Sequence, residues 1–275
     1  MHAGWESLKR TTPPYTMGNS PFISVIVVCK NPGPRIQKAL GSVWSQTCPN
    51  CELVVIDGGS SDGTHTWLHA NSARISHLII EEDGGIYDAM NKGVNHASGT
   101  WLYFLGADDR LAYPNILLAI AGILTNTPPN AIVSGSARYD NGREYQLRNA
   151  RRAITRNFAH HQATFYHRNL FQQHGNFDTS LRLMADYDLN LRMLAAGVSF
   201  RPLDLLVAEC GSCGISDAGR WLGYREEILV RHRHFPPAQC LFWDVCSLLR
   251  FFRKAMLRKL VKIKPDQRPN PSRRL

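Results

Sequence analysis

The sequence lacks the long apolar runs of an integral membrane protein. No stretch of its 275 residues approaches the roughly 18 apolar residues in a row that a transmembrane helix needs. Residues 1–20 contain no apolar segment of the kind found in a secretory signal, and their Thr, Pro, Ser and Gly content predicts a disordered lead-in. With 44% hydrophobic residues, the chain is long enough to bury a sizeable core.

Two common phosphate-binding loops are also missing. The chain contains no G-x-x-x-x-G-K-[ST] loop, and no G-x-G-x-x-G follows the first predicted strand. Bound phosphate groups would therefore depend on a metal ion and a few basic side chains. This argues against P-loop and dinucleotide chemistry.

Cysteine is present in an odd number. Seven cysteines without a visible secretory signal favour free thiols in a reducing cytoplasm over a disulfide framework. Two C-x-x-C pairs, at residues 48–51 and 210–213, resemble halves of a zinc site. One pair precedes a predicted strand and the other follows one, which works against gathering four sulfurs at about 2.3 Å from one ion. We therefore favour separate thiols over a zinc centre.

Acidic residues are scarce at the C-terminus. Residues 250–275 contain ten Lys and Arg and one acid, Asp266, which leaves the other 249 residues with +1 of the total charge of +10. A nucleic-acid-binding domain would carry its basic stripe on the fold itself, so we expect no nucleic-acid partner.

Four apolar runs predict buried strands that alternate with helices. The runs are residues 22–29, 53–56, 77–80 and 101–105. Continuous β-branched and aromatic runs are typical of strands buried on both faces. Helices are expected over about 35–45, 86–97 and 113–124. The repeated order predicts an α/β fold with a mostly parallel central sheet flanked by helices.

The pattern changes after residue 134. We expect an irregular segment or hairpin over 135–160, strands at 131–133, 162–166 and 203–208, a helix over 186–196 and a mobile glycine-rich loop over 211–219. The predicted organisation is a lead-in over 1–20, one domain over 21–235 and a basic amphipathic helix and tail over 236–275.

Acidic residues follow three of the predicted strands. Asp57 and Asp62 come after the second strand, Asp83 after the third, and Asp108 and Asp109 after the fourth. Ligands bind outside the carboxyl ends of strands in such sheets, so these side chains should meet on one rim. Because neighbouring carboxylates repel one another, a cation or hydrogen-bond donors should lie between them. The rim therefore predicts a site for a metal ion and a nucleotide or polyhydroxylated ligand.

Five ordered motifs resemble family 2 glycosyltransferases of the GT-A fold. They are SVIVVCKN at 24–31, VIDGGSSDGT at 55–64, GIYDAMNKG at 85–93, GTWLYFLGADD at 99–109 and ADYDL at 185–189. The resemblance covers about residues 22–235. It is nearest to bacterial enzymes that make exopolysaccharide, such as the colanic-acid type.

The resemblance implies transfer of a sugar from a nucleotide-sugar donor to a glycan acceptor, with Mg²⁺ or Mn²⁺ on the donor diphosphate. Asp57 would contact the nucleobase of the donor, Asp108 would contact its ribose, and Asp109 would hold the metal ion. The metal would act as a Lewis acid for the leaving nucleoside diphosphate. The remaining residues implied to line the donor site are Lys30, Asp62, Tyr87, Asp88, Asn91, Lys92 and His161.

The resemblance also implies a general base. Asp186 would deprotonate the acceptor hydroxyl opposite the leaving group, and one displacement would invert the anomeric carbon. Family members often have Glu-Asp where this chain has Ala185-Asp186, and Asp188 follows two residues later, so Asp188 remains an alternative base. His160 is expected to be structural, whereas His161 could serve either the site or the fold.

The segment at 214–216 resembles a motif of the same enzymes and would suit a lid over the donor. A plain surface loop is the alternative.

Residues 241–263 predict a basic amphipathic helix. Its apolar side comprises Leu241, Val245, Leu248, Leu249, Phe252, Met256, Leu260 and Ile263, and its basic side Arg250, Arg253, Lys254, Arg258 and Lys262. Such a helix favours binding to a membrane surface, and the alternative is packing on the domain with a solvated basic face. We expect a cytoplasmic protein at the inner face of the cell membrane, with a lipid-linked acceptor and a role in cell-surface polysaccharide synthesis.

Two other functions remain open. A nucleotidyltransferase would need a Gly-rich, Arg-containing loop after the first strand, and residues 30–35 are a poor version of one. A non-catalytic carbohydrate-binding or membrane-recruiting module would keep the fold without turnover. The acids at positions 57, 109 and 186 argue against that module.

Overall fold

The computed structural model describes residues 20–147, 150–211 and 221–263. Residues 1–19 of the expected lead-in, Cys213, the motif at 214–216 and the tail beyond residue 263 lie outside these ranges.

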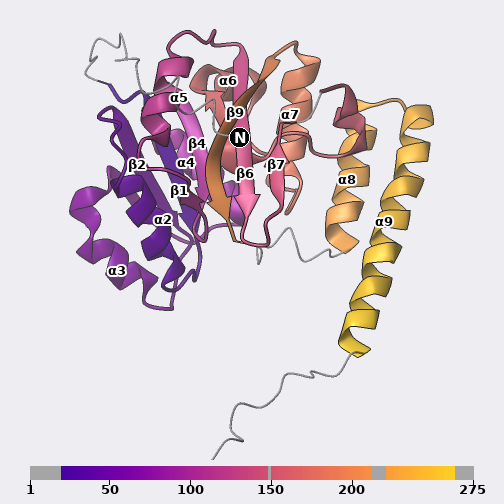
Figure 1. The fold of residues 1–275 in the computed structure, drawn as a ribbon, viewed down its shortest axis with the longest axis horizontal. Helices are drawn as coiled ribbons and strands as arrows, with labels where there is room; N and C mark the ends of the chain where they lie inside the picture. Colours follow the sequence, from indigo (N-terminus) through magenta and orange to yellow (C-terminus); the bar gives the residue numbers. More distant parts are fainter. Residues whose placement is uncertain (1–19, 148–149, 212–220, 264–275) are drawn as a thin grey trace, which may run out of the picture.

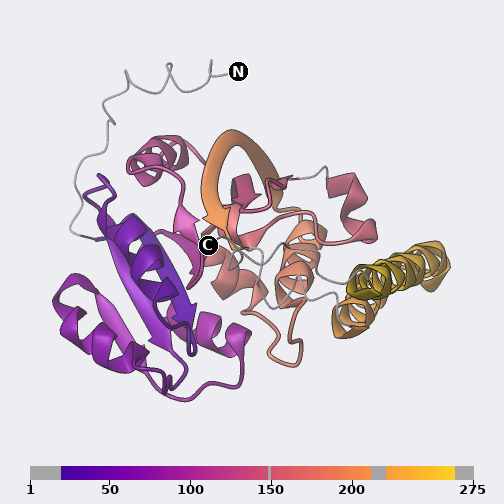
Figure 2. The ribbon, with the colours of Figure 1, turned by 60° about the horizontal axis from the view of Figure 1, so that its bottom comes forward.

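A mixed sheet forms the centre of the fold (Figure 1). Its first half consists of the parallel strands β1 (Ile23–Cys29), β2 (Cys51–Asp57), β3 (His77–Ile80) and β4 (Trp101–Gly106). Its second half consists of β5 (Arg110–Leu111), β6 (Ala131–Tyr139), β7 (Glu144–Gln146), β8 (Thr164–His167) and β9 (Ser199–Cys210). Over the described residues the order is β3-β2-β1-β4-β8-β6-β9-β5, with β7 beside β6. Figure 2 shows the strong curl of β9.

The register of the parallel strands confirms the expected rim. Cys29 at the end of β1 is level with Asp57 at the end of β2, and Val28 is level with Gly106 at the end of β4. The loops after these strands therefore leave the sheet at the same edge, as the acidic pattern predicts.

Helices cover both faces of the sheet. The core on one face includes residues of α2 (Arg35–Trp44), α3 (Thr64–Ala70) and α5 (Ile116–Leu124), and the core on the other includes residues of α4 (Ile86–His96), α6 (Arg168–His174) and α7 (Ala185–Ala195). Side chains alternate along a strand, so Val25 and Val27 belong to the first core while Ile26 and Val28 belong to the second. This explains why β1 is a continuous apolar run.

The second half of the sheet differs from the expected elements. β6 has nine residues instead of three, and β9 has twelve instead of six. The added residues of β6 begin with the buried but small or polar Ser134, Gly135 and Ser136, and most of those of β9 are exposed or half-buried, so neither extension appears as an apolar run. β8 lies antiparallel to both β4 and β6, so the sheet changes from parallel to mixed at β4. Short helix α6 has too few residues for a clear periodic pattern.

Two helices at the C-terminal end lie side by side (Figures 1 and 2). They are α8 (Trp221–His234) and α9 (Pro237–Ile263). The sequence pattern indicates the second but not the first, because the apolar residues of α8 do not form one stripe. None of the described helices is both long and apolar enough to cross a membrane.

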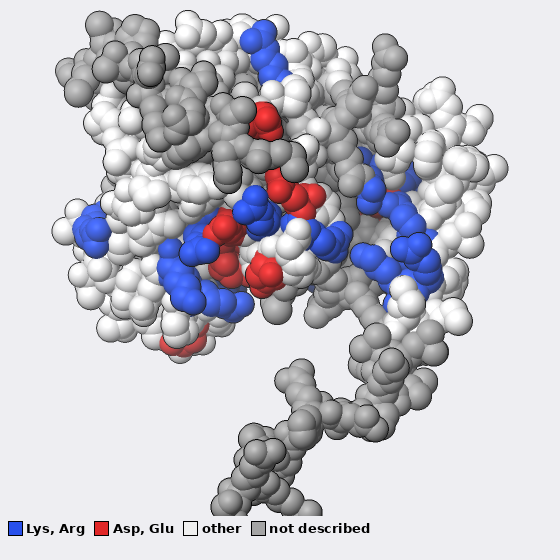
Figure 3. All heavy atoms as spheres, in the orientation of Figure 1, with Lys and Arg blue, Asp and Glu red and all other residues white. Residues whose placement is uncertain are grey.

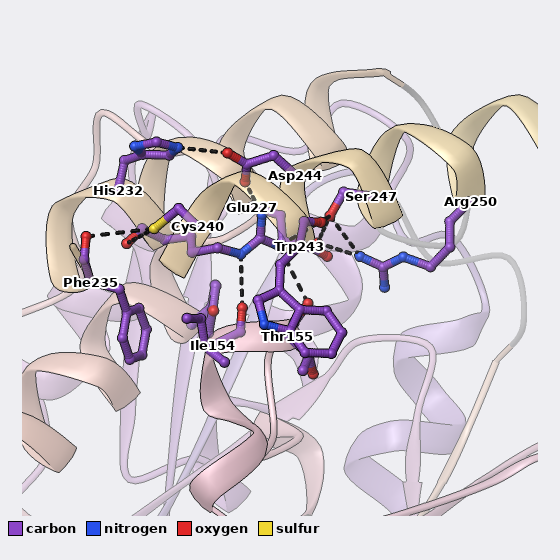
Figure 4. Close-up of polar contacts among 12 residues, drawn as sticks. Ile154, Thr155, Glu227, His232, Phe235, Cys240, Trp243, Asp244, Ser247 and Arg250 are labelled. Carbon is purple, nitrogen blue, oxygen red and sulfur yellow. Dashed lines mark hydrogen bonds and ion pairs between the residues drawn. The ribbon is translucent and has the colours of Figure 1, made fainter. Parts of the chain in front are cut away.

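A fully buried arginine joins these helices to the domain, and Figure 4 labels its partners Ile154, Thr155, Glu227 and Asp244. Arg231 of α8 contacts Asp244 of α9 and donates to Glu227 at 2.8 Å. It also donates to the carbonyl oxygens of Ile154 at 2.8 Å and Thr155 at 3.3 Å in the 3-10 helix η3 (Ala150–Thr155). A buried charge needs such partners, so this network fixes α9 against the fold.

The face of α9 that packs on α8 is its polar face. It includes Ser247, which is buried and donates to Glu227 at 2.6 Å, and Asp244. The apolar stripe points elsewhere: Leu241, Val245, Leu249, Phe252 and Met256 are 48–68% exposed. An apolar helix face without a partner among the described residues is unusual for a soluble surface.

Candidate active site

Asp57 ends β2 and is fully buried at the rim. Its Oδ1 accepts hydrogen bonds from the Ser60 backbone N–H at 3.1 Å and from the Ser60 hydroxyl at 2.5 Å. Its Oδ2 has no hydrogen-bond partner among the described residues. Because a buried carboxylate oxygen without a donor is costly, this atom suits an N–H or O–H group of a ligand.

The loops after β1 and β2 are braced against each other. The Asn31 side chain accepts a hydrogen bond from the Ser61 N–H at 2.7 Å. The Asp62 carboxylate accepts from the Gly33 N–H at 2.7 Å and the Thr64 N–H at 3.1 Å. Asp62, which the resemblance places in the donor site, is therefore engaged by backbone groups in this structure.

Asp83 lies against Gly58, the residue that follows Asp57 on the rim. A Cβ atom added to Gly58 would be 1.9 Å from the Asp83 carboxylate, so only glycine permits this close approach. The acids that follow β2 and β3 are thus brought together, as expected.

The donor-site residues predicted in α4 make contacts within the fold. Lys92 lies 2.9 Å from Glu81 and 3.4 Å from Asp88. Asn91 donates to the carbonyl oxygen of Phe177 at 2.9 Å and accepts from its N–H at 3.0 Å. Asn91 therefore connects α4 to the segment before α7. Its contact with the nucleotide-sugar stays a prediction. Lys30, by contrast, is exposed after β1.

Asp108 and Asp109 fold back over the end of β4. Asp109 is 3% exposed, and it accepts hydrogen bonds from the Gly211 N–H and from the Gln162 side chain, each at 3.1 Å. Burial raises the pKa of Asp109, and the charge of Asp108 raises it further. A Cβ atom at Gly106 would be 2.3 Å from Asp109 and 3.3 Å from Asp108, so both carboxylates share this small space.

The described residues contain no group of three or more His, Cys, Asp and Glu arranged to hold a metal ion. The adjacent Asp108 and Asp109 nevertheless fit a hard cation that takes its other oxygens from a bound ligand. A cation at this point would remove the repulsion that raises the pKa of Asp109.

Asp186 has more hydrogen-bond partners than the other carboxylates of the site. It lies in the first turn of α7, is 6% exposed, and accepts hydrogen bonds from the Tyr87 hydroxyl at 3.1 Å, the Asn157 amide at 2.8 Å and the Tyr187 N–H at 2.9 Å. His161 Nδ1 lies 3.3 Å from it. Burial opposes its ionisation, but the hydrogen bond and charge of His161 prevail and lower the pKa of Asp186. The helix N-terminus also favours the anion.

The two acids Asp109 and Asp186 are connected by adjacent residues. His161 contacts Asp186, and Gln162 donates to Asp109. Both belong to the short 3-10 helix η4 (His161–Ala163), next to β4 and β9. The predicted metal-binding acid and the predicted base therefore border one site, which spans the two halves of the sheet.

Asp188, the alternative base, has different surroundings. It lies 3.0 Å from Arg192 Nε, 2.9 Å from His234 Nε2 and 3.7 Å from Arg233. Burial opposes its ionisation, yet His234 and Arg192 lower its pKa. These contacts connect α7 to α8 and use the carboxylate within the fold.

His160 has the surroundings of a structural histidine. Its Nε2 lies 2.6 Å from the Tyr139 hydroxyl, and its ring stacks on His161 with 5.5 Å between centroids. Burial, with a smaller effect of His161, lowers the pKa of His160 to about 3. The ring is therefore neutral at ordinary pH and supports its neighbour.

Three residues of the site have no predicted role. Ser60 holds Asp57, Gln162 holds Asp109 and Asn157 holds Asp186. Gln162 could have been found from its place after His160-His161. Nothing in the sequence around Asn157 indicates that its amide meets a carboxylate 29 residues away.

Comparison with known proteins identifies the family. The family model described as glycosyl transferase family 2 matches residues 24–184. The chain belongs to glycosyltransferase family 2. The matched region contains nearly all of the parallel half of the sheet, and Gln162, one of the two residues that donate to Asp109.

Similar proteins occur in mycobacteria. A protein of Mycobacterium tuberculosis named "PGL/p-HBAD biosynthesis glycosyltransferase Rv2957" is 36% identical over 181 residues, which are 63% of this chain and 70% of that protein. Another from the same species, named an uncharacterized glycosyltransferase, is 31% identical over 64% of this chain and 70% of its own length. The colanic-acid type of family 2 enzyme stays a prediction.

Solved structures confirm the GT-A fold. TarS of S. aureus, residues 1–349 in complex with UDP-GlcNAc, superposes with a TM-score of 0.65 and 19% identity over 89% of this chain and 77% of that chain. The mannosyltransferase PcManGT of Pyrobaculum calidifontis, in complex with GDP-Man and Mn²⁺, gives a TM-score of 0.55 and 20% identity over 91% and 69%.

Proposed function

We propose that this family 2 glycosyltransferase is an inverting enzyme that transfers a sugar from a nucleotide-sugar to a hydroxyl of a glycan acceptor. The observation that supports this best is the Asp186 carboxylate, kept ionised by Tyr87, Asn157 and His161 next to the rim that carries Asp57 and Asp109. An ionised acid with lowered pKa is a weak but permanently available proton acceptor.

The donor would lie across the carboxyl ends of β1, β2 and β4. The Oδ2 atom of Asp57 would accept a hydrogen bond from the base, and Asp108 would contact the ribose. Asp109 would hold Mg²⁺ or Mn²⁺, which would act as a Lewis acid on the diphosphate. The mannosyltransferase complex with Mn²⁺ supports this choice of metal by analogy.

Asp186 would act on the acceptor. Its carboxylate would take the proton of the attacking hydroxyl while that oxygen forms a bond to the anomeric carbon. The bond from this carbon to the nucleoside diphosphate breaks, and the leaving group departs with the electron pair. Attack from the face opposite the leaving group inverts the anomeric configuration.

The function is tested by incubating the full chain with a set of nucleotide-sugars and Mn²⁺. We expect release of nucleoside diphosphate from one donor, dependent on the metal ion. Release of pyrophosphate from a nucleoside triphosphate and a sugar phosphate would favour a nucleotidyltransferase. Tight binding of nucleoside diphosphate without any turnover, with every acceptor offered, would favour the non-catalytic module.

We also propose that the enzyme works at the inner face of the cell membrane on a lipid-linked acceptor, in cell-surface polysaccharide synthesis. The exposed apolar stripe of α9 supports this, and Arg253 and Lys254 on the same helix are exposed. Each basic residue near an anionic surface contributes about 1 kcal/mol. In a flotation assay with anionic vesicles, Leu249→Glu/Phe252→Glu should abolish binding, whereas Leu229→Glu on α8 should not.

A further inference from the structure

A cavity of about 240 Å³ lies next to Asn157 and His160, outside the donor rim. Its walls come from the β6–β7 hairpin, the segment 156–160, the residues before α7, and helices α8 and α9. None of the loops that directly follow β1, β2, β3 and β4 lines it. The cavity is therefore separate from the site proposed for the nucleotide, and the part of its wall that α8 and α9 supply lies beyond the matched family region.

The charge of this cavity is strongly positive. Four cationic side chains line it, from three separate segments: Arg143, Arg156, Arg250 and Lys254. The one carboxylate in the wall, Glu227, already contacts Arg231 and Arg250. Figure 3 shows a group of Lys and Arg side chains on the α8–α9 side of the molecule. A group with more than one negative charge suits such an enclosure better than a single carboxylate.

One of these cations has an unused donor. The Nε atom of Arg250 is buried and has no hydrogen-bond partner among the described residues, while its NH2 group contacts Glu227 and Ser247. A buried guanidinium N–H without an acceptor is costly, so it favours binding of an oxygen-rich anion.

Tyrosine rings form another part of the wall. Tyr139, Tyr145 and Tyr224 line the cavity. Arg143 lies 5.4 Å from the Tyr145 ring centroid, and Arg250 lies 6.0 Å from that of Tyr224. Flat rings held beside cations suit an apolar sugar face that is attached to an anionic group.

The cavity reaches the residues that hold the predicted base. Asn157 lines it and donates to Asp186 at 2.8 Å. His160 also lines it and stacks on His161, which contacts Asp186. A molecule in this cavity therefore lies one side chain away from the acid expected to activate the acceptor.

We propose that this basic cavity is the acceptor subsite and that it binds a phosphate or diphosphate group carried by the acceptor. The inference rests on the proposed transferase function and extends it to the acceptor's chemical class. Arg250 and Lys254 lie on α9 together with the exposed Leu249 and Phe252, so an acyl chain on the same acceptor could run along the apolar stripe.

The test measures binding of decyl phosphate to the full chain by calorimetry, below the concentration at which it forms micelles. Decyl glucoside is the neutral probe, and glucose 1-phosphate is the soluble phosphate. We expect decyl phosphate to bind and decyl glucoside to bind at least about tenfold more weakly, the effect of losing one charge-assisted hydrogen bond. Equal binding of glucose 1-phosphate would keep the subsite and assign it a soluble acceptor.

Variants locate the binding. Arg143→Gln/Lys254→Gln should weaken decyl phosphate binding by about tenfold or more. Arg225→Gln, at an exposed position of α8 outside the cavity, should leave it unchanged. Unchanged thermal unfolding of the double variant excludes loss of the fold as the cause.

Equal affinity for the neutral probe, or an equal loss in Arg225→Gln, would overturn the subsite. Nucleoside diphosphate binding is measured in the same variants to separate the two proposals. If the subsite is wrong, the donor still binds and turns over. If the transferase assignment is wrong, no nucleotide-sugar turns over in the wild-type protein, whatever the cavity binds.

Discussion

The hydroxyl of Tyr87 donates a hydrogen bond to the carboxylate of Asp186 at 3.1 Å, although 99 residues separate them. Tyr87 lies in α4 and Asp186 in α7, two helices on the same face of the sheet. Burial raises the pKa of Tyr87 well above 10, and the charge of Asp186 adds to the effect. The phenol therefore remains a donor at every pH of interest, and packing between the two helices positions the acid.

The roles of Asp186 and Asp188 can be separated by matched variants. Asp186→Asn should lower kcat by about 10²- to 10⁴-fold, the usual contribution of a general base, while nucleoside diphosphate affinity stays unchanged. Asp188→Asn should instead lower thermal stability, because Arg192 and His234 lose a charged partner. Steady-state kinetics and thermal unfolding of both proteins check this. If Asp188→Asn alone stopped turnover in a folded protein, the assignment would be reversed.

Asp57 should control donor affinity. In Asp57→Asn, an NH₂ group would replace the unpartnered Oδ2. This hydrogen-bond donor would face the N–H group of the nucleobase, which is also a hydrogen-bond donor. We expect nucleoside diphosphate to bind about 10- to 100-fold more weakly, as when a buried hydrogen bond to a charged group is lost. Asp204→Asn, an exposed position in β9, is the control. Calorimetric titration gives both affinities, and equal values would remove Asp57 from the donor site.

The acid limb of the pH–rate profile should depend on His161. In the wild type, this residue lowers the pKa of Asp186, so the base stays ionised below the usual range of Asp. His161→Asn removes that effect and should move the acid limb of kcat to higher pH. His65→Asn, on exposed α3, should leave the profile unchanged. A His161→Asn limb that coincides with the wild type contradicts the pairing.

The sequence predicts the parallel half of the molecule well for a physical reason. Strands β1, β2 and β4 are buried on both faces, so each appears as an apolar run that ends at a polar loop. The rim acids follow directly from that pattern. Only the resemblance to a known family assigns these acids to contacts with the nucleobase, the ribose and the metal ion.

The other half depends on contacts that no local pattern contains. Asn157 and Gln162 become site residues only because β8 inserts between β4 and β6, which brings the preceding segment to the rim. The sequence does not predict α8, because its buried face contains Glu226, Glu227 and Arg231. Charged residues of this kind are expected at the surface. The exposed apolar stripe of α9 is visible in the sequence, but which face packs on the domain is not.

The buried network around Arg231 should contribute strongly to stability. Arg231→Met leaves Glu227 and Asp244 without their central cation, and removing one partner of a buried ion pair costs about 3–5 kcal/mol. Arg110→Met breaks an exposed pair with Glu209 and should cost about 0–1 kcal/mol. Denaturant unfolding of both variants gives the two values. A similar small loss in both would show that Arg231 is replaceable.

Glu52, at the edge of the sheet opposite the rim, should make stability depend on pH. Burial opposes its ionisation, but it accepts hydrogen bonds from Ser24, from the N–H and hydroxyl of Ser98 and from the Gly99 N–H, which lower its pKa. Its contribution is therefore present above the unfolded value of about 4.3 and disappears as pH falls through the lower folded value.

Glu52→Gln should thus destabilise the protein by about 1–3 kcal/mol at pH 7. The difference from wild type should shrink below about pH 4. Urea unfolding across this range measures it, with Glu144→Gln in exposed β7 as the control. A difference that stays constant with pH would mean that Glu52 is not ionised in the folded protein.

The insertion of β8 has a consequence for any shortened form of the chain. β4 pairs with β1 on one side and with β8 on the other, through Trp101, Leu102 and Tyr103. A fragment that ends after α5 would keep all four parallel strands and every acid of the rim, yet β4 would present an unpaired, apolar edge. Such an edge is a template for strands of other chains. We therefore expect the isolated N-terminal half to aggregate instead of forming a small nucleotide-binding domain.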